Sequence, residues 1–453
     1  MIQRAEHDYL FYFYRYVQPI WYFNLRPATT LPYWVDYRKI SAEDQSLLSI
    51  DHEYSSEEAV LRDAAYQAWQ KGIMYTDPSV SLTQPFARLG IQDEYRFIKK
   101  YFHPVWLVYV LAVRILSFRN PFIEIYSFLR SLTVARVNPH ENPKTQPGYL
   151  SFQSGLQKES PLVSVIIPTL NRQVYLQDVL ADLSSQQYKN FEVIIVDQNE
   201  KLDHAFYADW PFTLHAIHQS EKALWLARNT AIRMAKGEYI LLFDDDSRVE
   251  PDWIEQHLGC LDYFNCQLSA GVSISVVGSR VPQNYSFFRW ADQLDTGNVM
   301  IRKEVLKKIG LFDRQFERQR MGDGEFGLRS FLAGYRSVSN PNAQRLHLKV
   351  ETGGLRQMGS WDGFRPTNWF APRPIPSVLY LVRNYFGNRS AILDLMIKVP
   401  PSVLPFRYKR KPVLLLLGGI VSMVVMPIVI FQVVKSWRMA SGMIHQGQKI
   451  ESL

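Results

Sequence analysis

Residues 236–246 read Lys236-Gly237-Glu238-Tyr239-Ile240-Leu241-Leu242-Phe243-Asp244-Asp245-Asp246. The apolar run in the middle is typical of a strand that is buried on both faces of a sheet. Ligands of open α/β sheets bind beyond the carboxyl ends of the strands, which is where the three aspartates follow. Carboxylates in that position suit Mg²⁺ or Mn²⁺, which bind one or two of them and use other positions to hold a diphosphate. Acidic triplets are also common as solvated turns, so the motif alone leaves both interpretations open.

The composition indicates a globular protein with more than one core. The chain has 453 residues, of which 47% are apolar and 21% are charged. Single cores rarely grow to that size, so we expect two or three units. Its two cysteines, Cys260 and Cys266, are too few for a disulfide framework and lack the spacing of a zinc site. We interpret them as packing residues in a reducing compartment.

The net charge of +8 indicates an anionic partner. Basic residues gather beside apolar stretches in two places, a pattern that favours a membrane surface over nucleic acid. They are Arg114, Arg119, Arg130 and Arg136 within residues 105–137, and Arg407, Lys409, Arg410 and Lys411 just before residue 413.

Residues 413–434 form the most apolar stretch, in which only Ser422 and Gln432 have polar side chains. A helix of this length, rising ~1.5 Å per residue, matches the ~30 Å hydrocarbon core of a bilayer. The stretch therefore predicts a transmembrane helix, with a buried core helix or a re-entrant hairpin as alternatives. The denser basic group lies before it, which predicts a single-pass protein of the inner membrane with its catalytic part in the cytoplasm.

The remaining segments outside the central region carry weaker signals. Residues 1–137 are rich in aromatic residues and read as helical, without a motif that indicates a role. Within them, the apolar run 105–116 is interrupted by Arg114 and is too short to cross a bilayer. Together with 122–137 it predicts either a segment lying in the membrane interface or a helical pair packed on the catalytic domain. We expect a linker at 138–160, a juxtamembrane segment rich in proline and basic residues at 366–412, and a short tail at 435–453.

Residues 161–365 alternate short β-branched runs with helical patterns, which predicts an α/β fold with a mostly parallel, Rossmann-like sheet. We expect strands at 162–167, 191–196, 213–217 and 239–243, with helices near 174–186 and 222–236. Polar residues follow three of these strands, at 168–172, 197–199 and 244–246. Because parallel strands end at the same edge, these loops should converge there.

Several motifs occur in a fixed order along this region. Residues 164–172 form the first strand and loop, 193–197 a strand ending in aspartate, 227–229 the triplet Ala-Arg-Asn, and 237–246 the strand with the Asp-x-Asp motif. They are followed by 297–303, 310–313 and the helix pattern 322–329. Together they resemble the inverting family 2 glycosyltransferases of the GT-A fold, and the resemblance covers about residues 161–354.

The resemblance implies a role for each motif. Asp323 would be the catalytic base, and Asn298 and Glu325 would lie on the acceptor side. Asp244, Asp246 and His347 would bind Mn²⁺ or Mg²⁺. The donor nucleotide would be bound by Pro168, Thr169, Asn171, Arg172, Asp197, Arg228, Asp244 and Asp245. Some motifs also have structural interpretations: Asp323 could cap a helix, and His347 could be an ordinary structural histidine.

The expected function is transfer of one sugar from a UDP-, dTDP- or GDP-linked donor to a glycan or lipid-linked acceptor at a membrane. No Gln-x-x-Arg-Trp segment of processive synthases follows Asp323, which favours single transfer. The sequence also departs from the family at residues 221–226, where glycines are usual, and at Gly322, where an acid is usual. A non-catalytic scaffold with the same fold is the alternative. A nucleotidyltransferase is disfavoured, because a glycine-rich, lysine-containing pyrophosphate loop is absent after the first strand.

Overall fold

The computed structural model describes residues 5–29, 31–275, 282–350, 353–354, 363–366, 368–405 and 412–453. The chain forms two compact units, and each is made from two separate segments. Unit 1 contains residues 1–145 and 382–400, and unit 2 contains residues 146–381 and 401–453. Helix α14 (Pro376–Tyr385) begins in unit 2 and ends in unit 1.

Unit 1 is helical, and aromatic side chains fill its core. Its helices are α1 (Tyr14–Val17), α2 (Ala42–Ser46), α3 (Glu57–Gln70), α4 (Ile91–Tyr101), α5 (Pro104–Leu116), α6 (Pro121–Ser131) and α15 (Gly387–Lys398). Phe11 stacks on Phe97 with ring centroids 4.0 Å apart, and Trp21 meets Trp69 edge to face. Aromatic pairs of this kind add to the stabilisation from burial alone. The aromatic-rich sequence of this region is thus explained by a packed core.

Unit 2 is built on one mixed sheet with the strand order β3-β2-β1-β4-β8-β6-β9-β5. Strands β1 (Val163–Thr169), β2 (Phe191–Asp197), β3 (Thr213–His218) and β4 (Tyr239–Phe243) are parallel, which confirms the four predicted strands. The rest of the sheet is formed by β5 (Ser247–Val249), β6 (Leu268–Ser275), β8 (Asn298–Arg302) and β9 (Ser337–His347), while the short β7 (Arg289–Trp290) pairs with β9.

The prediction of a mostly parallel sheet holds only for its first half. β8 runs antiparallel to both β4 and β6, and β5 runs antiparallel to β9. β1, β2 and β4 are completely buried and mostly apolar, whereas β3 at the edge is partly exposed and β9 alternates buried and more exposed residues and carries several polar side chains. β6 and β9 are parallel to each other, so this half of the sheet is mixed. Strand β9 lacks the uniform hydrophobic run by which β1, β2 and β4 were predicted.

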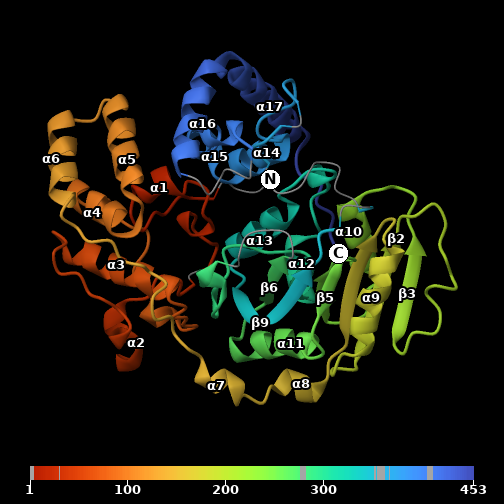
Figure 1. Ribbon diagram of the computed structural model, residues 1–453. Coiled ribbons are helices and arrows are strands. Elements are labelled where there is room, and N and C mark those ends of the chain that lie inside the picture. The colour runs from red at the N-terminus through yellow and green to blue at the C-terminus, as the bar shows by residue number, and fades with distance from the viewer. Residues whose placement is uncertain are drawn as a thin grey trace. The chain divides into compact units, whose positions relative to one another are not determined.

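Helices cover both the parallel and the mixed part of this sheet. They are α9 (Gln173–Ser184), α10 (Leu224–Met234), α11 (Trp253–Tyr263), α12 (Lys303–Ile309) and α13 (Gly322–Leu332), of which α9 and α10 were predicted. Helix α10 packs on β1 and β2, and α11 runs beside β9 (Figure 1). Two short helices, α7 (Pro147–Leu150) and α8 (Gly155–Glu159), lie in the segment expected to be a linker, and Ser154 Oγ donates to Asp262 of α11 at 2.7 Å.

The continuous helix predicted over residues 413–434 is not found. Residues 413–434 belong to two helices, α16 (Pro412–Val424) and α17 (Met426–Gln446), which are separated at Val425. Pro427 lies in the first turn of α17, where its missing N–H is tolerated but where it would interrupt a continuous helix. Within the described part of the chain, we find no helix that is both long and apolar enough to cross a membrane. The basic residues Arg407, Lys409, Arg410 and Lys411 lie outside the described residues.

The strand register brings the predicted loops together. Thr169, at the end of β1, pairs with Asp197, at the end of β2. Ser247 of β5 pairs with His347 of β9, and the amide of Leu348 donates to the carbonyl of Asp246 at 2.9 Å. The far end of β9 is therefore fixed beside the aspartates that follow β4.

Candidate active site

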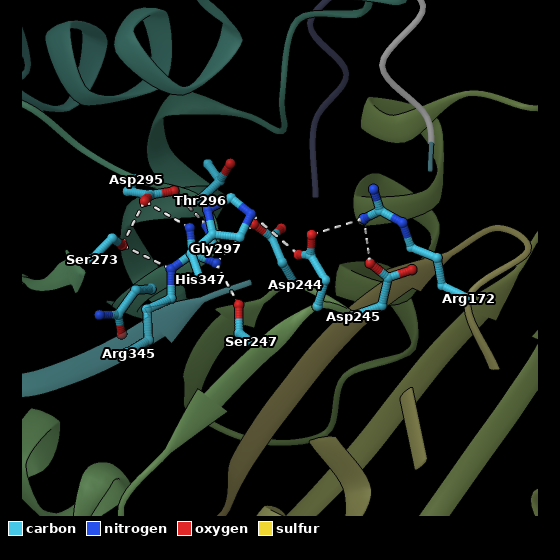
Figure 2. A network of polar contacts seen from close by, with 12 residues as sticks. Arg172, Asp244, Asp245, Ser247, Ser273, Asp295, Thr296, Gly297, Arg345 and His347 are labelled. Carbon is cyan, nitrogen blue, oxygen red and sulfur yellow. Dashed lines mark hydrogen bonds and ion pairs between the residues drawn. The ribbon is translucent and has the colours of Figure 1, made fainter. Parts of the chain in front are cut away.

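The aspartates after β4 are held by basic side chains: Arg228 and Arg345 contact Asp244, and Arg172 contacts both Asp245 and Asp246. Figure 2 shows Asp244 and Asp245 in this network. Asp244 accepts from Arg228 Nη2 at 2.9 Å and from Arg345 Nη1 at 2.8 Å. Asp246 lies 3.2 Å from His347 Nε2 and 3.2 Å from Arg172 Nη1. The triplet is therefore an ordered part of unit 2, and the interpretation as a solvated turn is excluded.

Asp244, Asp246 and His347 form a candidate metal site. Each offers one ligand atom, and these atoms all lie within 4.8 Å of one another. Two carboxylates and an imidazole are donors that Mn²⁺ accepts, and the carboxylates also suit Mg²⁺. The residues present therefore fit a divalent cation. The pairing of β5 with β9 explains why a histidine a hundred residues downstream reaches this place.

Asp245 faces the interior and not the metal ligands. It accepts from Thr169 Oγ1 at 2.8 Å and from Arg172 Nη1 at 3.0 Å. Burial raises the pKa of Asp245 to about 6, although Arg172 opposes this rise. Asp245 thus connects the loop after β1 to the acidic triplet, and it orients Arg172.

Arg345 is a central residue of the site that the sequence did not reveal. Its side chain is 1% exposed. Besides Asp244, it donates to Asp295 Oδ2 and Ser273 Oγ, at 2.8 and 2.7 Å (Figure 2). Burial by itself would raise the pKa of Asp295, but the Arg345 guanidinium holds that pKa at about 2. A usable signal existed, because Arg345 is two residues before His347 on a strand and so lies on the same face.

Gly297 allows Arg345 and Asp244 to meet. A Cβ atom at this position would lie 2.1 Å from Arg345 Nη1 and 2.2 Å from Asp244 Oδ2. Contacts this short do not occur between real atoms, so only glycine fits here without displacing the ion pair.

The loops after β1 and β2 support each other. Asn171 has a φ of +54°, and its amide donates to Asn199 Oδ1 at 2.6 Å. Asp197 is completely buried and accepts from Tyr207 Oη at 2.7 Å, while Pro168 lies within β1 opposite Val196. These bonds fix the predicted donor loop before any ligand binds.

Of residues 351–356, the structure describes Gly353 and Gly354. Both have positive φ, and the amide of Gly354 donates to the carbonyl of Leu170 at 2.8 Å. A Cβ on Gly354 would meet the Arg172 guanidinium at 2.6 Å. The glycine pair therefore allows close approach to the loop after β1.

Trp225 connects the aspartates to the predicted catalytic helix. The Arg228 guanidinium lies 5.2 Å from the centre of the Trp225 ring, and a Cβ on Gly322 would lie 2.3 Å from Cζ2 of the same ring. Glu317, which the sequence analysis also missed, accepts from the amides of Trp225 and Leu226 at 3.2 and 2.7 Å, and so supplies the cap at the start of α10. Helix α13 begins at Gly322, so Asp323 lies in its first turn, one residue from this contact.

The two predicted acceptor-side residues have buried side chains. Asn298 bonds to Trp253, His257 and the carbonyls of Val272 and Ala343. Glu325 is completely buried and forms a two-point ion pair with Arg329, at 2.8 and 3.0 Å. Contact between either side chain and an acceptor would require these bonds to break.

The mixed sheet and the acidic cluster at its edge define an α/β domain of the GT-A type. Residues 164–317 match the family described as Glycosyl transferase family 2. This part of the chain is a glycosyltransferase domain of family 2, as the motifs predicted.

The similarity to individual proteins is local. EpsH of Bacillus subtilis (strain 168) is 36% identical over 104 residues, which cover 22% of this chain and 30% of EpsH. Chondroitin synthase of Escherichia coli is 34% identical over 123 residues, which cover 26% of this chain and 17% of the synthase. The chain thus matches less than a third of the length of these two relatives. A crystal structure of S. aureus TarS 1–349 in complex with UDP-GlcNAc is 17% identical with a TM-score of 0.41, covering 63% of this chain and 92% of that one.

Proposed function

We propose that this protein transfers one sugar from a nucleotide-sugar donor to a hydroxyl group of an acceptor, with inversion at the anomeric carbon and with dependence on Mn²⁺ or Mg²⁺. The observation that carries the proposal is the cluster of Asp244, Asp246 and His347, within 4.8 Å of one another, at the edge of a family 2 domain. A cation bound there would neutralise charge on the diphosphate leaving group.

The protein's own cations surround the same place. Arg228 and Arg345 both contact Asp244, and Arg172 contacts Asp245 and Asp246. Fixed positive charges beside a developing negative charge stabilise the transition state without reorganisation. We assign Arg228 and Arg172 to the diphosphate, and Arg345 to holding Asp244 in position.

Asp323 is the proposed base. Its carboxylate would take the proton of the acceptor hydroxyl as that oxygen bonds to the anomeric carbon. The bond from the anomeric carbon to the diphosphate breaks at the same time, and the nucleoside diphosphate leaves from the opposite face. The contact of Gly322 with Trp225, which also packs on Arg228, supports the placement of Asp323 near the donor.

The proposed acceptor is a lipid-linked or cell-surface glycan precursor at the cytoplasmic side of the inner membrane. A donor from the aqueous phase would account for the nucleotide-binding domain. An acceptor held in a membrane would account for the basic and apolar segments of the same chain. This proposal requires attachment to the membrane surface.

Calorimetric titration of the purified protein with UDP-, GDP- and dTDP-sugars tests the proposal, with Mn²⁺ or Mg²⁺ and again with EDTA. We expect one nucleotide class to bind, with affinity that falls at least tenfold in EDTA and in Asp246→Asn. Asp178→Asn, an exposed change on α9, is the matched control and should bind normally. Absence of donor binding under all conditions would overturn the proposal and favour a non-catalytic scaffold.

A further inference from the structure

The hairpin of α5 and α6, residues 104–132, is held rigidly on its inner side. The two helices lie side by side (Figure 1). Arg114 of α5 forms a buried ion pair with Glu124 of α6, at 2.8 Å between Nε and Oε2, and Tyr95 Oη donates to the same carboxylate. The side chains of Leu107 and Val110 are buried on this inner side. These contacts determine which side of the hairpin faces outward.

That outer side is apolar to an unusual degree. Phe118 is 99% exposed, Phe122 is 83% exposed and Leu116 is 76% exposed, and all three lie at or beside the turn between the helices. Ile125 and Leu129 continue the exposed surface along α6. Single exposed apolar residues are common, but a contiguous group of this kind marks an interaction surface.

The backbone of the turn gives a second, independent indication. Phe118 has a φ of +56°, its amide donates to the carbonyl of Ile115, and the amide of Arg119 donates to the carbonyl of Arg114. This is a Schellman motif, whose left-handed position is usually glycine or asparagine. In this chain that position holds Phe118, so the backbone is strained and a large aromatic ring is exposed to water. Entry of the ring into an apolar phase would gain free energy that compensates for the strain.

The exposed charges on and beside the hairpin are positive, which favours an anionic partner. Glu124 is the only acidic residue between His103 and Val137, and it is buried in the ion pair with Arg114. The exposed charges are Arg119 and Arg130 on the hairpin and Arg136 just after it, all positive. Arginine beside apolar residues can bind lipid phosphates while its stem stays in the apolar layer.

A groove beside α6 extends the same surface. It is a shallow, open groove of about 640 Å³ that runs between the start of α4 and helix α6, and it is lined by Ser55, Gly90, Ile91, Gln92, Phe122, Ile123, Tyr126 and Ser127. Its walls are largely apolar, so it can take a hydrocarbon chain that lies next to the inserted turn.

We propose that the α5–α6 hairpin is a membrane-docking surface that inserts Leu116, Phe118 and Phe122 into a bilayer and binds anionic headgroups through Arg119, Arg130 and Arg136. The inference deepens the proposed function, on which it rests for the membrane acceptor. Binding to lipid itself is measurable without any sugar donor.

The test is co-sedimentation of the full-length protein with vesicles of phosphatidylcholine alone or with 30% phosphatidylglycerol. The apolar variant is Leu116→Gln/Phe118→Gly/Phe122→Gln, in which glycine relieves the strain at position 118. Its control, Leu150→Gln/Met234→Gln/Ile392→Gln, removes exposed apolar residues elsewhere. We expect the apolar variant to lose at least tenfold in partitioning on both vesicles, and its control to lose less than twofold.

A charge variant separates the two contributions. Arg119→Gln/Arg130→Gln/Arg136→Gln should lose at least tenfold on the anionic vesicles and little on phosphatidylcholine alone. The control Lys189→Gln/Lys201→Gln/Lys307→Gln removes the same charge from unit 2 and should keep its binding.

Two outcomes would overturn the inference. If the apolar variant partitions onto vesicles as strongly as the wild type, the membrane contact lies elsewhere, for example at α16 and α17. A wild type that ignores vesicles but self-associates, and loses this association in the apolar variant, would make the hairpin an interface between two copies. Calorimetric titration of the same variants with sugar donors in lipid-free buffer tests the proposed transferase separately. If no donor binds, the proposed function fails, but the vesicle measurement still decides whether the hairpin binds lipid.

Discussion

Arg345 provides the buried positive charge that lets two carboxylates share one site. It pairs with Asp244 and Asp295 at 2.8 Å each, and its side chain is almost inaccessible. Removing one partner of a buried ion pair typically costs about 3–5 kcal/mol, because the remaining charges lose their compensation. We therefore expect Arg345→Met to lower the free energy of unfolding by about that amount in urea titrations with EDTA.

Arg248 of β5 offers a matched control for this prediction. It forms a comparable ion pair with Asp182, but its side chain is 43% exposed. Exposed pairs contribute roughly 0–1 kcal/mol, so Arg248→Met should change stability little. Equal effects of the two substitutions would show that Arg345 has no special role.

Asp323 is the residue on which the proposed chemistry depends. Asp323→Asn keeps the size of the side chain but cannot accept the acceptor proton, so kcat should fall by about 10²- to 10⁴-fold. The donor affinity from calorimetry should stay within about twofold, because no proton moves on donor binding. Normal turnover in Asp323→Asn would refute the assignment, and Asp178→Asn again serves as the exposed control.

The individual residues of the site were predictable when they belonged to a motif. Asp244, Asp246 and His347 were named from sequence, and the structure brings them together. Asp295, Trp225 and Glu317 were not, because each has a hydrogen-bond partner 50 or more residues away in the chain, and Arg345 could be found only from its place two residues before His347. Such pairings depend on strand order and register, which hydrophobic periodicity does not encode.

At the scale of elements, α11 is tied to the sheet by a buried, neutral histidine. His257 bonds to Ser269 Oγ of β6 at 2.9 Å and to Asn298 Oδ1 of β8 at 3.1 Å. Burial lowers the pKa of His257 to about 4, from an ordinary value of 6.5. The unfolded chain therefore binds a proton between these pH values and the folded chain does not.

His257 makes the folded protein less stable at acidic pH. The contribution of this residue to the free energy of unfolding is fully present above pH 6.5 and is lost as the pH falls towards 4. We therefore expect the free energy of unfolding to fall by about 2 kcal/mol between pH 7 and pH 5. Urea unfolding of wild type and His257→Gln at both pH values measures this: the variant should be less stable at pH 7 but should have the smaller pH dependence. His204→Gln, an exposed change, should keep the wild-type slope. An unchanged slope in His257→Gln would disprove the assignment.

Elements were predictable from sequence where burial was uniform. The strands at 191–197 and 239–243 and the helices α9 and α10 have regular hydrophobic patterns, and their predicted and observed ends agree within a few residues. The error at residues 413–434 has a local cause, since composition there is that of one long helix while the chain breaks at Val425 ahead of Pro427. Hydropathy averaged over a window does not detect such a break.

At the scale of the molecule, the two units are interleaved in sequence. Residues 382–400 fold with the amino-terminal region, although 401–453 return to unit 2. His7 Nε2 lies 2.9 Å from the carbonyl of Phe386, and Ala391 and Asp394 of α15 are buried in unit 1. A linear division of the chain could not predict this, because nothing in residues 382–400 indicates which distant segment will cover them.

Interleaving predicts how the protein responds to a cut in the connection between the units. A chain divided between Thr145 and Gln146, with both parts co-expressed and a tag on residues 1–145, should copurify as a complex, because 382–400 complete unit 1 from the other fragment. Residues 146–453 expressed alone expose the buried side of residues 382–400, including Phe386 and Ala391. This fragment should therefore lose apolar contacts and show a lower Tm than the complex. The control is the same tag on residues 1–145 with Phe386→Asp and Ala391→Asp in the second fragment, which should abolish copurification. Separate recovery of two stable fragments, each with the thermal stability of the intact protein, would show that unit 1 does not depend on α15.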